Sequence, residues 1–232
     1  MRKYIITGAI FAVVAFLCGA FIIKNAQIVN YDNYDLNTIL PGDEANGNIA
    51  DHVKGNPDAP VLLFEYADYQ CPGCATLNPR LNTLLDEYGD KLGVVYRSYL
   101  LSYHQNGTAA ASAAEAAAMQ GYWKEYADLL FSNQNSWGYA SGDERTEYFE
   151  KYFTQVAGDK GDMEKFRKDM ASSEVSKKIK FDIGAGNVVG IDSTPTLMLN
   201  GEKINVAGHS TTDDFLNFMR ETIDAELEKK EK

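Results

Sequence analysis

Two cysteines separated by two residues, in the segment Cys71-Pro72-Gly73-Cys74, constrain the fold of this chain more than any other feature. The four residues 61–64 that precede this segment are continuously apolar, which is typical of a strand buried on both faces. Apolar residues at helical spacing follow the segment as far as Tyr88, and Gly89 is the glycine that commonly follows a last helical turn. The sequence therefore predicts that the cysteine pair joins a central strand to a helix.

The remaining pattern predicts an α/β fold. A second strand is expected at 92–101, so that strand, helix and strand form one parallel, right-handed βαβ unit. Helical periodicity with glycine breaks predicts three or four helices over 108–183, inserted between sheet elements. The chain then returns to the sheet through a hairpin and ends in a helix. These last elements are expected at 196–199, at 203–206 after an Asn200-Gly201 turn, and at 212–227.

The position of the first cysteine carries a chemical prediction. Unpaired N–H groups and the positive end of the helix dipole favour an anion at a helix amino terminus. Cys71 is therefore expected to have a lowered pKa and to attack as a thiolate. Cys74 lies one helical turn further on, where it can resolve a mixed disulfide, and Pro72 suits the first helical turn.

Other uses of a Cys-x-x-Cys pair fit this chain less well. A zinc site would need two further ligands, but beyond residue 24 the chain has no other cysteine and its histidines are scattered. A structural disulfide across four residues would constrain the unfolded chain little. We therefore expect no metal and no cofactor beyond a redox-active Cys71–Cys74 disulfide.

Two further positions are candidates for the same site. Glu65, between Phe64 and Tyr66 on the apolar strand, is either a strand-end residue that reaches solvent or, as we prefer, a partly buried proton acceptor near Cys74. The Thr194-Pro195 step precedes a strand, where proline can be a simple entry residue. It could also be a cis peptide that leaves the backbone of Thr194 open to a substrate strand.

The amino terminus predicts a membrane anchor. Residues 4–23 carry no charge, and Arg2 and Lys3 precede them. About 20 apolar residues span a ~30 Å hydrocarbon core, whereas the apolar region of a cleavable signal is usually shorter. Residues 1–24 are thus expected to be an uncleaved anchor, with cleavage after Ala20 as the alternative. The basic end should stay inside, which places the rest of the chain outside the cytoplasm.

Cys18 and the segment that follows the predicted anchor both have simple structural interpretations. Cys18 follows Leu17, where a lipoprotein processing site would need a small residue, so it is interpreted as an apolar residue of the membrane helix. Residues 25–58 are rich in Asn, Asp and Gly and are predicted to form a polar tether with one short strand near Ile49–Val53.

The charge of the chain excludes one class of partner. Lys and Arg number 22 against 33 Asp and Glu, which gives a formal net charge of −11. Binding to nucleic acid is driven by clustered cations, so no nucleic-acid partner is expected.

Several ordered motifs resemble one family, the DsbA-type thiol-disulfide oxidoreductases, and most closely its membrane-anchored BdbD-like members. The motifs are Gly55 to Val61, Glu65 to Cys74, Gln120 to Trp123, Thr194 to Thr196, and Asn200-Gly201. The resemblance implies a thioredoxin-like fold with an inserted α-helical domain, preceded by a transmembrane helix. The implied segments are the anchor (1–24), the tether (25–58), a first thioredoxin part (59–104), the helical insertion (105–190) and a second thioredoxin part (191–232).

The resemblance also assigns roles to residues. It implies that Cys71 attacks, Cys74 resolves, Glu65 is the buried acid, and Pro195 faces the pair in its cis form. Thr194, Pro72 and Gly73 would contact the substrate, and Pro79 matches the kink proline of the active-site helix. DsbA has histidine where this chain has Gly73, so a group that helps to stabilise the thiolate is replaced.

The expected function is extracytoplasmic thiol-disulfide exchange at the bacterial cell membrane. The protein would be a single-pass membrane protein that introduces disulfides into reduced exported proteins. A quinone-linked membrane thiol oxidase, DsbB-like or VKOR-like, would reoxidise it. A thiol reductase or isomerase of the same fold is the near alternative, and a membrane-anchored polypeptide-binding holdase is the alternative from another class.

Overall fold

The computed structural model describes residues 29–230. Residues 29–33 contain the 3-10 turn η1 (Tyr31–Asn33) and are assigned to a first unit, whereas residues 34–230 belong to a second. The predicted anchor, with Cys18 and the possible cleavage after Ala20, lies outside the described residues. Within residues 29–230, no helix is long and apolar enough to cross a membrane.

A five-stranded sheet forms the centre of the second unit, with the strand order β1-β3-β2-β4-β5. Its strands are β1 (His52–Gly55), β2 (Val61–Ala67), β3 (Leu92–Ser98), β4 (Thr196–Leu199) and β5 (Glu202–Lys203). Strands β2 and β3 are parallel and are connected through helix α2 (Pro72–Tyr88), which confirms the predicted βαβ unit. Strands β1 and β4 pair antiparallel to β3 and β2.

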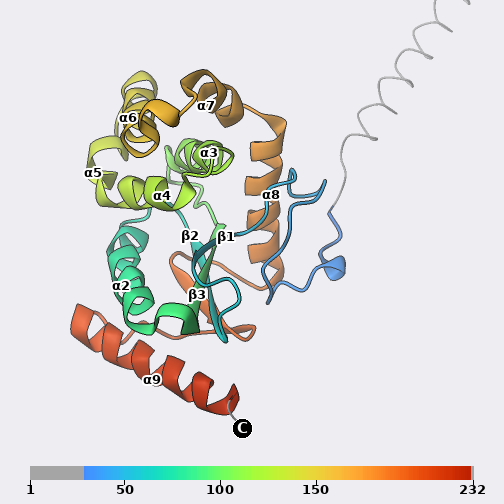
Figure 1. Cartoon of the computed structure of the whole chain (residues 1–232), viewed down its shortest axis with the longest axis vertical. Helices are drawn as coiled ribbons and strands as arrows, with labels where there is room; N and C mark the ends of the chain where they lie inside the picture. Colours follow the sequence, from blue (N-terminus) through green and yellow to red (C-terminus); the bar gives the residue numbers. More distant parts are fainter. Residues whose placement is uncertain (1–28, 231–232) are drawn as a thin grey trace, which may run out of the picture. The chain divides into compact units, whose positions relative to one another are not determined.

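Side chains alternate across the sheet and give it two apolar faces. Leu63 belongs to the apolar cluster that includes residues of α2 and of α9 (Thr212–Lys230), whereas the next residue, Phe64, belongs to a separate cluster. Figure 1 shows α8 (Ser173–Val188) on the side of the sheet opposite α2. The sheet is therefore covered on both faces, as the continuous apolar run in β2 predicts.

The helical insertion lies between β3 and β4 and is described throughout. It consists of α3 (Gly107–Ala118), α4 (Trp123–Ser132), α5 (Gln134–Trp137), α6 (Gly142–Ala157), the 3-10 turn η3 (Gly158–Lys160), α7 (Met163–Met170) and α8. These are more helices than the three or four predicted, because the chain also breaks at 119–122 and at 171–172, and the short helix α5 forms inside the predicted break that begins at Asn133. Alanines of α3 pack in the centre, where small side chains allow helices to approach closely.

The carboxyl-terminal elements follow the prediction with shifted ends. Asn200 and Gly201 have φ angles of 51° and 81°, the conformation of the tight hairpin turn that Asn-Gly favours. Strand β5 ends at Lys203, so the return strand is shorter than the expected 203–206. Helix α2 ends before the 3-10 turn η2 (Gly89–Lys91), and Gly89 has a positive φ of 53°, which confirms the predicted helix end.

The predicted polar tether over residues 25–58 is wrong for residues 34–58. Leu36, Leu40 and Ile49 are buried, and the short strand begins at His52 instead of near Ile49. The polar residues that suggested a tether form hydrogen bonds within the fold. The buried Asp51, for example, accepts a hydrogen bond from the backbone N–H of Leu40 at 3.0 Å.

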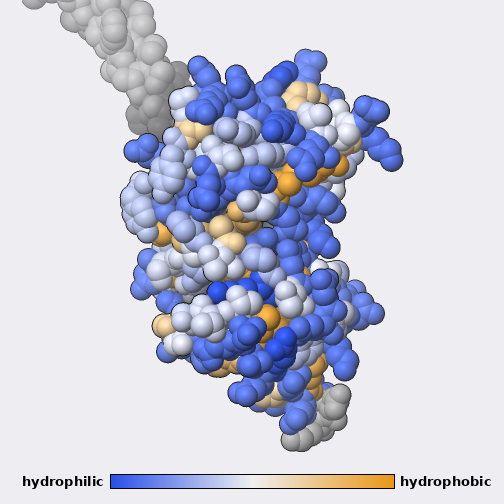
Figure 2. Space-filling model, turned by 90° about the vertical axis from the view of Figure 1, so that its left-hand side faces the viewer, coloured by the Kyte–Doolittle hydropathy of each residue, from blue (hydrophilic) through white to orange (hydrophobic). Residues whose placement is uncertain are grey.

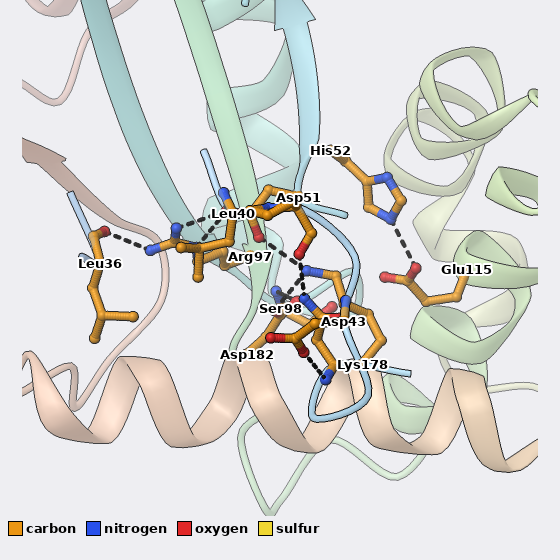
Figure 3. Close-up of polar contacts among 12 residues, drawn as sticks. Leu36, Leu40, Asp43, Asp51, His52, Arg97, Ser98, Glu115, Lys178 and Asp182 are labelled. Carbon is orange, nitrogen blue, oxygen red and sulfur yellow. Dashed lines mark hydrogen bonds and ion pairs between the residues drawn. The ribbon is translucent and has the colours of Figure 1, made fainter. Parts of the chain in front are cut away.

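A buried ionic network attaches this segment to the sheet and to α8 (Figure 3). One oxygen of Asp51 accepts hydrogen bonds from Arg97 of β3 at 2.6 and 3.1 Å, and the other accepts one from Lys178 of α8 at 3.0 Å. Lys178 also donates to Asp182 at 2.8 Å, and Arg97 donates to the carbonyl oxygen of Leu36 at 2.7 Å. The side chains of Asp51, Arg97 and Lys178 have no solvent exposure. Two buried cations therefore share the carboxylate of Asp51, and Lys178 has a second partner in Asp182.

We expect Asp51→Asn to lower the free energy of unfolding by roughly 3–5 kcal/mol, because it leaves Arg97 and Lys178 partly uncompensated in the interior. Glu150→Gln is the matched control, because Glu150 pairs with Arg167, whose side chain is 58% exposed. Loss of this exposed ion pair should lower the free energy of unfolding by only about 0–1 kcal/mol. Urea denaturation measures both, and equal small losses would contradict a central role for Asp51.

Candidate active site

The two cysteines lie at the amino terminus of α2, as predicted. Cys71 is the N-cap residue and Pro72 is the first helical residue. The turn before the helix is closed by a hydrogen bond from the N–H of Cys71 to the carbonyl oxygen of Asp68 at 2.9 Å. Both cysteines are free thiols in this structure, and Cys71 is 7% exposed whereas Cys74 has no exposure. Only the first thiol can therefore be reached from outside.

The surroundings of Cys71 stabilise its thiolate. A hydrogen bond from the Cys74 thiol makes the largest contribution to lowering the pKa of Cys71. The Thr194 hydroxyl and the backbone N–H groups of Cys74 and Gly73 lower it further, and although partial burial opposes them the pKa falls to about 5. Cys71 is thus ionised at neutral pH, as its place at the helix terminus predicts.

The surroundings of Cys74 have the opposite effect. Burial is the largest cause that raises the pKa of Cys74 well above its ordinary value, followed by its hydrogen bond to Cys71 and by the charge of Glu65. Glu65 is itself only 4% exposed, and burial raises its pKa to about 7. The site thus combines a thiolate that is barely accessible from outside, a fully buried thiol and a buried carboxyl group that can change protonation near neutral pH.

Sheet register explains how Glu65 reaches the cysteines. It lies on the same face of β2 as Leu63 and is paired with Tyr96 of β3 and Leu197 of β4. That face is the one covered by α2, whose first turn carries Cys74. The preferred interpretation of Glu65 as a buried acid near Cys74 therefore agrees with its position, and the alternative of a strand-end residue reaching solvent does not.

The loop before β4 faces the cysteines from the other side. The Thr194-Pro195 peptide bond is cis, as expected. The Sγ of Cys71 lies 3.2 Å from the carbonyl oxygen of Thr194. The Thr194 hydroxyl is buried with no hydrogen-bond partner of normal geometry among residues 29–230, so it is available to a Cys71 thiolate.

Gly73 has a steric role that the sequence did not indicate. A Cβ atom at this position would lie 2.9 Å from Cδ of Pro195 and 3.6 Å from Sγ of Cys71. The loop that carries Pro195 therefore packs directly on the backbone of Gly73. The histidine found here in DsbA would need this loop to shift.

Sequence reasoning missed the polar residues that fix the active-site turn to the insertion. Gln134 donates to the carbonyl oxygens of Tyr69 and Cys71 at 2.7 and 3.0 Å. The side chain of Gln70 donates to the carbonyl oxygen of Gly138 and accepts from the N–H of Asn106. These contacts join residues that are 36 to 68 positions apart, so no local sequence signal reveals them.

Sequence reasoning also missed a charged residue beside Glu65. Lys54 of β1 is 6% exposed, and its positive charge opposes the rise in the pKa of Glu65. Lys54 pairs with Val94, and Val94 pairs with Leu63, so these three residues lie side by side on the face of the sheet that α2 covers. Glu65 lies on the same face, two residues after Leu63 along β2. The available signal was a lysine at an inward position of a short strand. It was missed because residues 25–58 were predicted to form a polar tether.

Comparison with known proteins agrees with this geometry. Residues 47–221 match the family described as Thioredoxin. The chain belongs to the thioredoxin family. Among solved structures, alpha-DsbA1 of Wolbachia pipientis has a TM-score of 0.61 at 21% identity and covers 82% of this chain and 94% of its own. BdbD of Bacillus subtilis, in its oxidised form, has a TM-score of 0.58 at 21% identity and covers 83% of this chain and 100% of its own.

These structural neighbours confirm the predicted thioredoxin fold, and the resemblance to DsbA-type proteins that they show is one of fold. Curated relatives of another kind also match part of this chain. The Na(+)/H(+) antiporter NhaA 1 of Mycolicibacterium gilvum is 34% identical over 156 residues, which are 66% of this chain. The chain spans about a quarter of the length of these curated relatives, 24% in this case.

We expect the Cys71 thiol of the reduced protein to titrate with a pKa of about 5, and Thr194→Val to raise that pKa because it removes one hydrogen-bond donor. The pH dependence of the alkylation rate, together with ultraviolet thiolate absorbance, measures this. Thr76→Val is the control, because the Thr76 hydroxyl donates to the carbonyl oxygen of Pro72 and lies on the exposed side of α2. A Cys71 pKa near the ordinary thiol value in the unsubstituted protein would contradict the described site.

Proposed function

We propose that this protein is an extracytoplasmic thiol-disulfide oxidoreductase that introduces disulfides into exported proteins through Cys71 and Cys74. The observation that carries the proposal is the contrast between the two thiols. Cys71 has a lowered pKa at the mouth of the site, and Cys74 has a raised pKa in the interior. A low pKa makes Cys71 a good leaving group, so the Cys71–Cys74 disulfide is easily reduced and the protein acts as an oxidant.

The proposed reaction starts with the protein in its disulfide form. A substrate thiolate attacks Sγ of Cys71, the bond to Cys74 breaks, and the Cys74 thiolate takes a proton from Glu65. A second substrate thiolate then attacks the substrate sulfur of the mixed disulfide and releases the Cys71 thiolate. The substrate loses two electrons and two protons. The protein pair gains the two electrons. Cys74 keeps the proton that Glu65 gave, one of the two substrate protons restores Glu65, and the other goes to solvent because Cys71 stays ionised.

The proposed partners follow from this chemistry. Reduced exported polypeptides are the substrates, and they would pass over the cis-Pro195 loop, where Thr194, Pro72 and Gly73 surround the thiolate. A quinone-linked membrane thiol oxidase, DsbB-like or VKOR-like, would accept the two electrons: the Cys71 thiolate attacks its disulfide, and Cys74 then resolves the mixed disulfide and re-forms the Cys71–Cys74 disulfide. The apolar residues 4–23 support a single-pass location in the bacterial cell membrane with this domain outside the cytoplasm.

A reductase or isomerase of the same fold is the alternative, and the stability of the two redox forms separates it from a disulfide donor. The pKa of Cys71 is lowered by folding, so its contribution to the stability of the reduced form is present above the unfolded pKa and is lost as pH falls through about 5. The reduced protein should therefore become more stable relative to the oxidised protein as pH rises from about 5 to about 9.

Denaturation of the reduced and the oxidised protein across this pH range measures the difference in their stability. Equilibration with glutathione measures the reduction potential. We expect the reduction potential of the Cys71–Cys74 disulfide to be clearly less negative than the ~−270 mV of thioredoxin. A potential near that value, or a stability difference that does not change with pH, would overturn the donor role and favour a reductase.

A second experiment tests the holdase alternative. Cys74→Ala should accumulate mixed disulfides between Cys71 and exported proteins in the native membrane, because the resolving thiol is absent. Cys71→Ala is the matched control and should accumulate none. Mass spectrometry of affinity-purified adducts reads the result. Polypeptide binding that is equal in both variants, with no covalent adducts, would favour a binding module.

A further inference from the structure

Two ionic contacts join the strands near the cysteines to the side of the molecule that carries the insertion. On the α2 side, Nζ of Lys54 donates to Oδ1 of Asp128 in α4 at 2.5 Å, and the side chain of Asp128 is 34% exposed. Directly after β2, the carboxylate of Asp68 lies 2.8 Å from Nδ1 of His104, in the loop between β3 and α3. The side chain of Asp68 has no solvent exposure and that of His104 is 12% exposed. The second contact is therefore the more deeply buried, and it lies three residues before Cys71.

The backbone of Asp68 contacts both cysteines. Its carbonyl oxygen accepts the hydrogen bond from the N–H of Cys71 that closes the turn, at 2.9 Å. Burial raises the pKa of Cys74 most strongly, and a backbone hydrogen bond from Asp68 opposes that rise. Because this hydrogen bond favours the thiolate, its donor is the N–H of Asp68. The position of Asp68 therefore affects both how the turn holds Cys71 and which donor the Cys74 sulfur receives.

The side chain of Asp68 holds this backbone in place. Its Oδ1 accepts from the N–H of Gln70 at 2.9 Å, and its Oδ2 accepts from the N–H of Leu101 at 2.9 Å and from His104. An ionised carboxylate has no proton to donate, so Nδ1 of His104 carries the hydrogen in this contact. Among residues 29–230, His104 is the only basic side chain that pairs with Asp68. The carboxylate thus connects the active-site turn to the loop that leads into the insertion.

Helix α3 begins directly against the same carboxylate. A Cβ atom on Gly107, the first residue of α3, would lie 2.8 Å from Oδ1 of Asp68, which is too close for either group to stay where it is. The unpaired N–H groups and the positive end of the helix dipole favour a carboxylate at this place. The insertion therefore contacts the active-site turn through its first helical residue as well as through the loop before it.

We propose that His104 is a positioning residue for disulfide exchange, which acts through Asp68 to keep a backbone N–H directed at the sulfur of Cys74. The inference rests on the proposed function. When a substrate thiolate attacks Sγ of Cys71, the bond to Cys74 breaks and the Cys74 sulfur leaves with the electron pair as a thiolate. The N–H of Asp68 donates to that sulfur until a proton reaches it from Glu65. In the reverse reaction, the same N–H stabilises the Cys74 thiolate that attacks.

The proposal predicts an effect on one thiol and not on the other. The Cys74 thiol, the Thr194 hydroxyl and N–H groups in the first turn of α2 lower the pKa of Cys71, and the Asp68 N–H is not among these donors. Loss of the His104 donor should therefore slow the steps in which Cys74 attacks or leaves, and should not change attack by Cys71. A general loosening of the fold would instead change both.

The test uses the purified, reduced full-length chain and an aromatic disulfide reagent with a coloured thiolate product. Attack by Cys71 releases one reagent thiolate in a first phase. Attack by Cys74 on the mixed disulfide releases the other in a second phase and leaves the Cys71–Cys74 disulfide. Helices α2 and α4 lie on the left in Figure 1, and the surface of that side, which faces the viewer in Figure 2, is mostly hydrophilic. The reagent therefore meets no broad apolar surface there that would hold it beside the thiols.

The variant His104→Phe removes the donor and keeps an aromatic ring. His104 borders an open hollow of about 440 Å³ beside α8, so the larger ring has space. We expect the second phase to slow roughly threefold, because a higher pKa of Cys74 lowers its thiolate fraction more than it raises the nucleophilicity of the thiolate. The first phase should not change. His104→Asn, whose amide N–H can take the place of the Nδ1–H, should restore the second phase.

The matched control is His209→Phe. Nδ1 of His209 pairs with Asp214 at 3.0 Å in a partly exposed contact outside the turn, so this variant removes the same kind of contact and should change neither phase. Gly107→Ala is a second variant, because alanine favours a helix more than glycine does while its Cβ displaces the carboxylate of Asp68. It should slow the second phase alone, and it decides the question if His104→Phe does not fold.

Equal slowing of both phases, an unchanged second phase in Gly107→Ala, or a second phase that His104→Asn does not restore would each overturn the positioning role. The reagent replaces the protein substrate in all of these measurements. A reductase-like potential, or failure to transfer disulfides to exported proteins, would overturn the donor role and would leave the comparison of the two phases intact. Failure of the proposed function is therefore seen separately from failure of this inference.

Discussion

The difference in protonation between two sulfur atoms one helical turn apart is the constraint on which the rest of this structure depends. Water and backbone N–H groups reach Cys71, whereas Cys74 and Glu65 are in an interior where a charge is costly. This difference requires α2 to begin directly after Cys71, because a start one turn later would remove the N–H groups from the thiolate. It also requires β2 to be covered by α2, because an open sheet would hydrate Glu65.

The insertion and the segment 34–51 pack around this interior. Aromatic side chains of the insertion pack on the turn before Cys71, and the Trp123 indole N–H donates to the hydroxyl of Tyr69 at 3.1 Å. Gln134 holds the backbone of the turn, so the position of Cys71 is fixed from outside the thioredoxin part. On the opposite face of the sheet, Asp51 holds Arg97 and Lys178. The site thus depends on segments that a minimal strand-helix-strand unit does not contain.

The sequence predicted those parts of the fold whose causes are local. The cysteine pair at a helix start, the βαβ unit and the Asn200-Gly201 turn all depend on residues close together in the chain. The tether prediction was wrong because composition does not show what a polar residue binds. Asp51 looks like a loop residue until Arg97, 46 positions later, is seen beside it. Lys54 and Asp128 were missed for the same reason, since 74 positions separate them.

A buried acid can exchange protons near neutral pH only if its environment avoids two extremes. A close ion pair would hold Glu65 as a carboxylate, and complete isolation would hold it as an acid. In this protein a lysine lies near the carboxyl group, and the lysine is in turn shared with Asp128. The charges therefore alternate in sign from the interior to the surface. Each partly cancels the effect of the one before it, which leaves the pKa of Glu65 at about 7, between the two extremes.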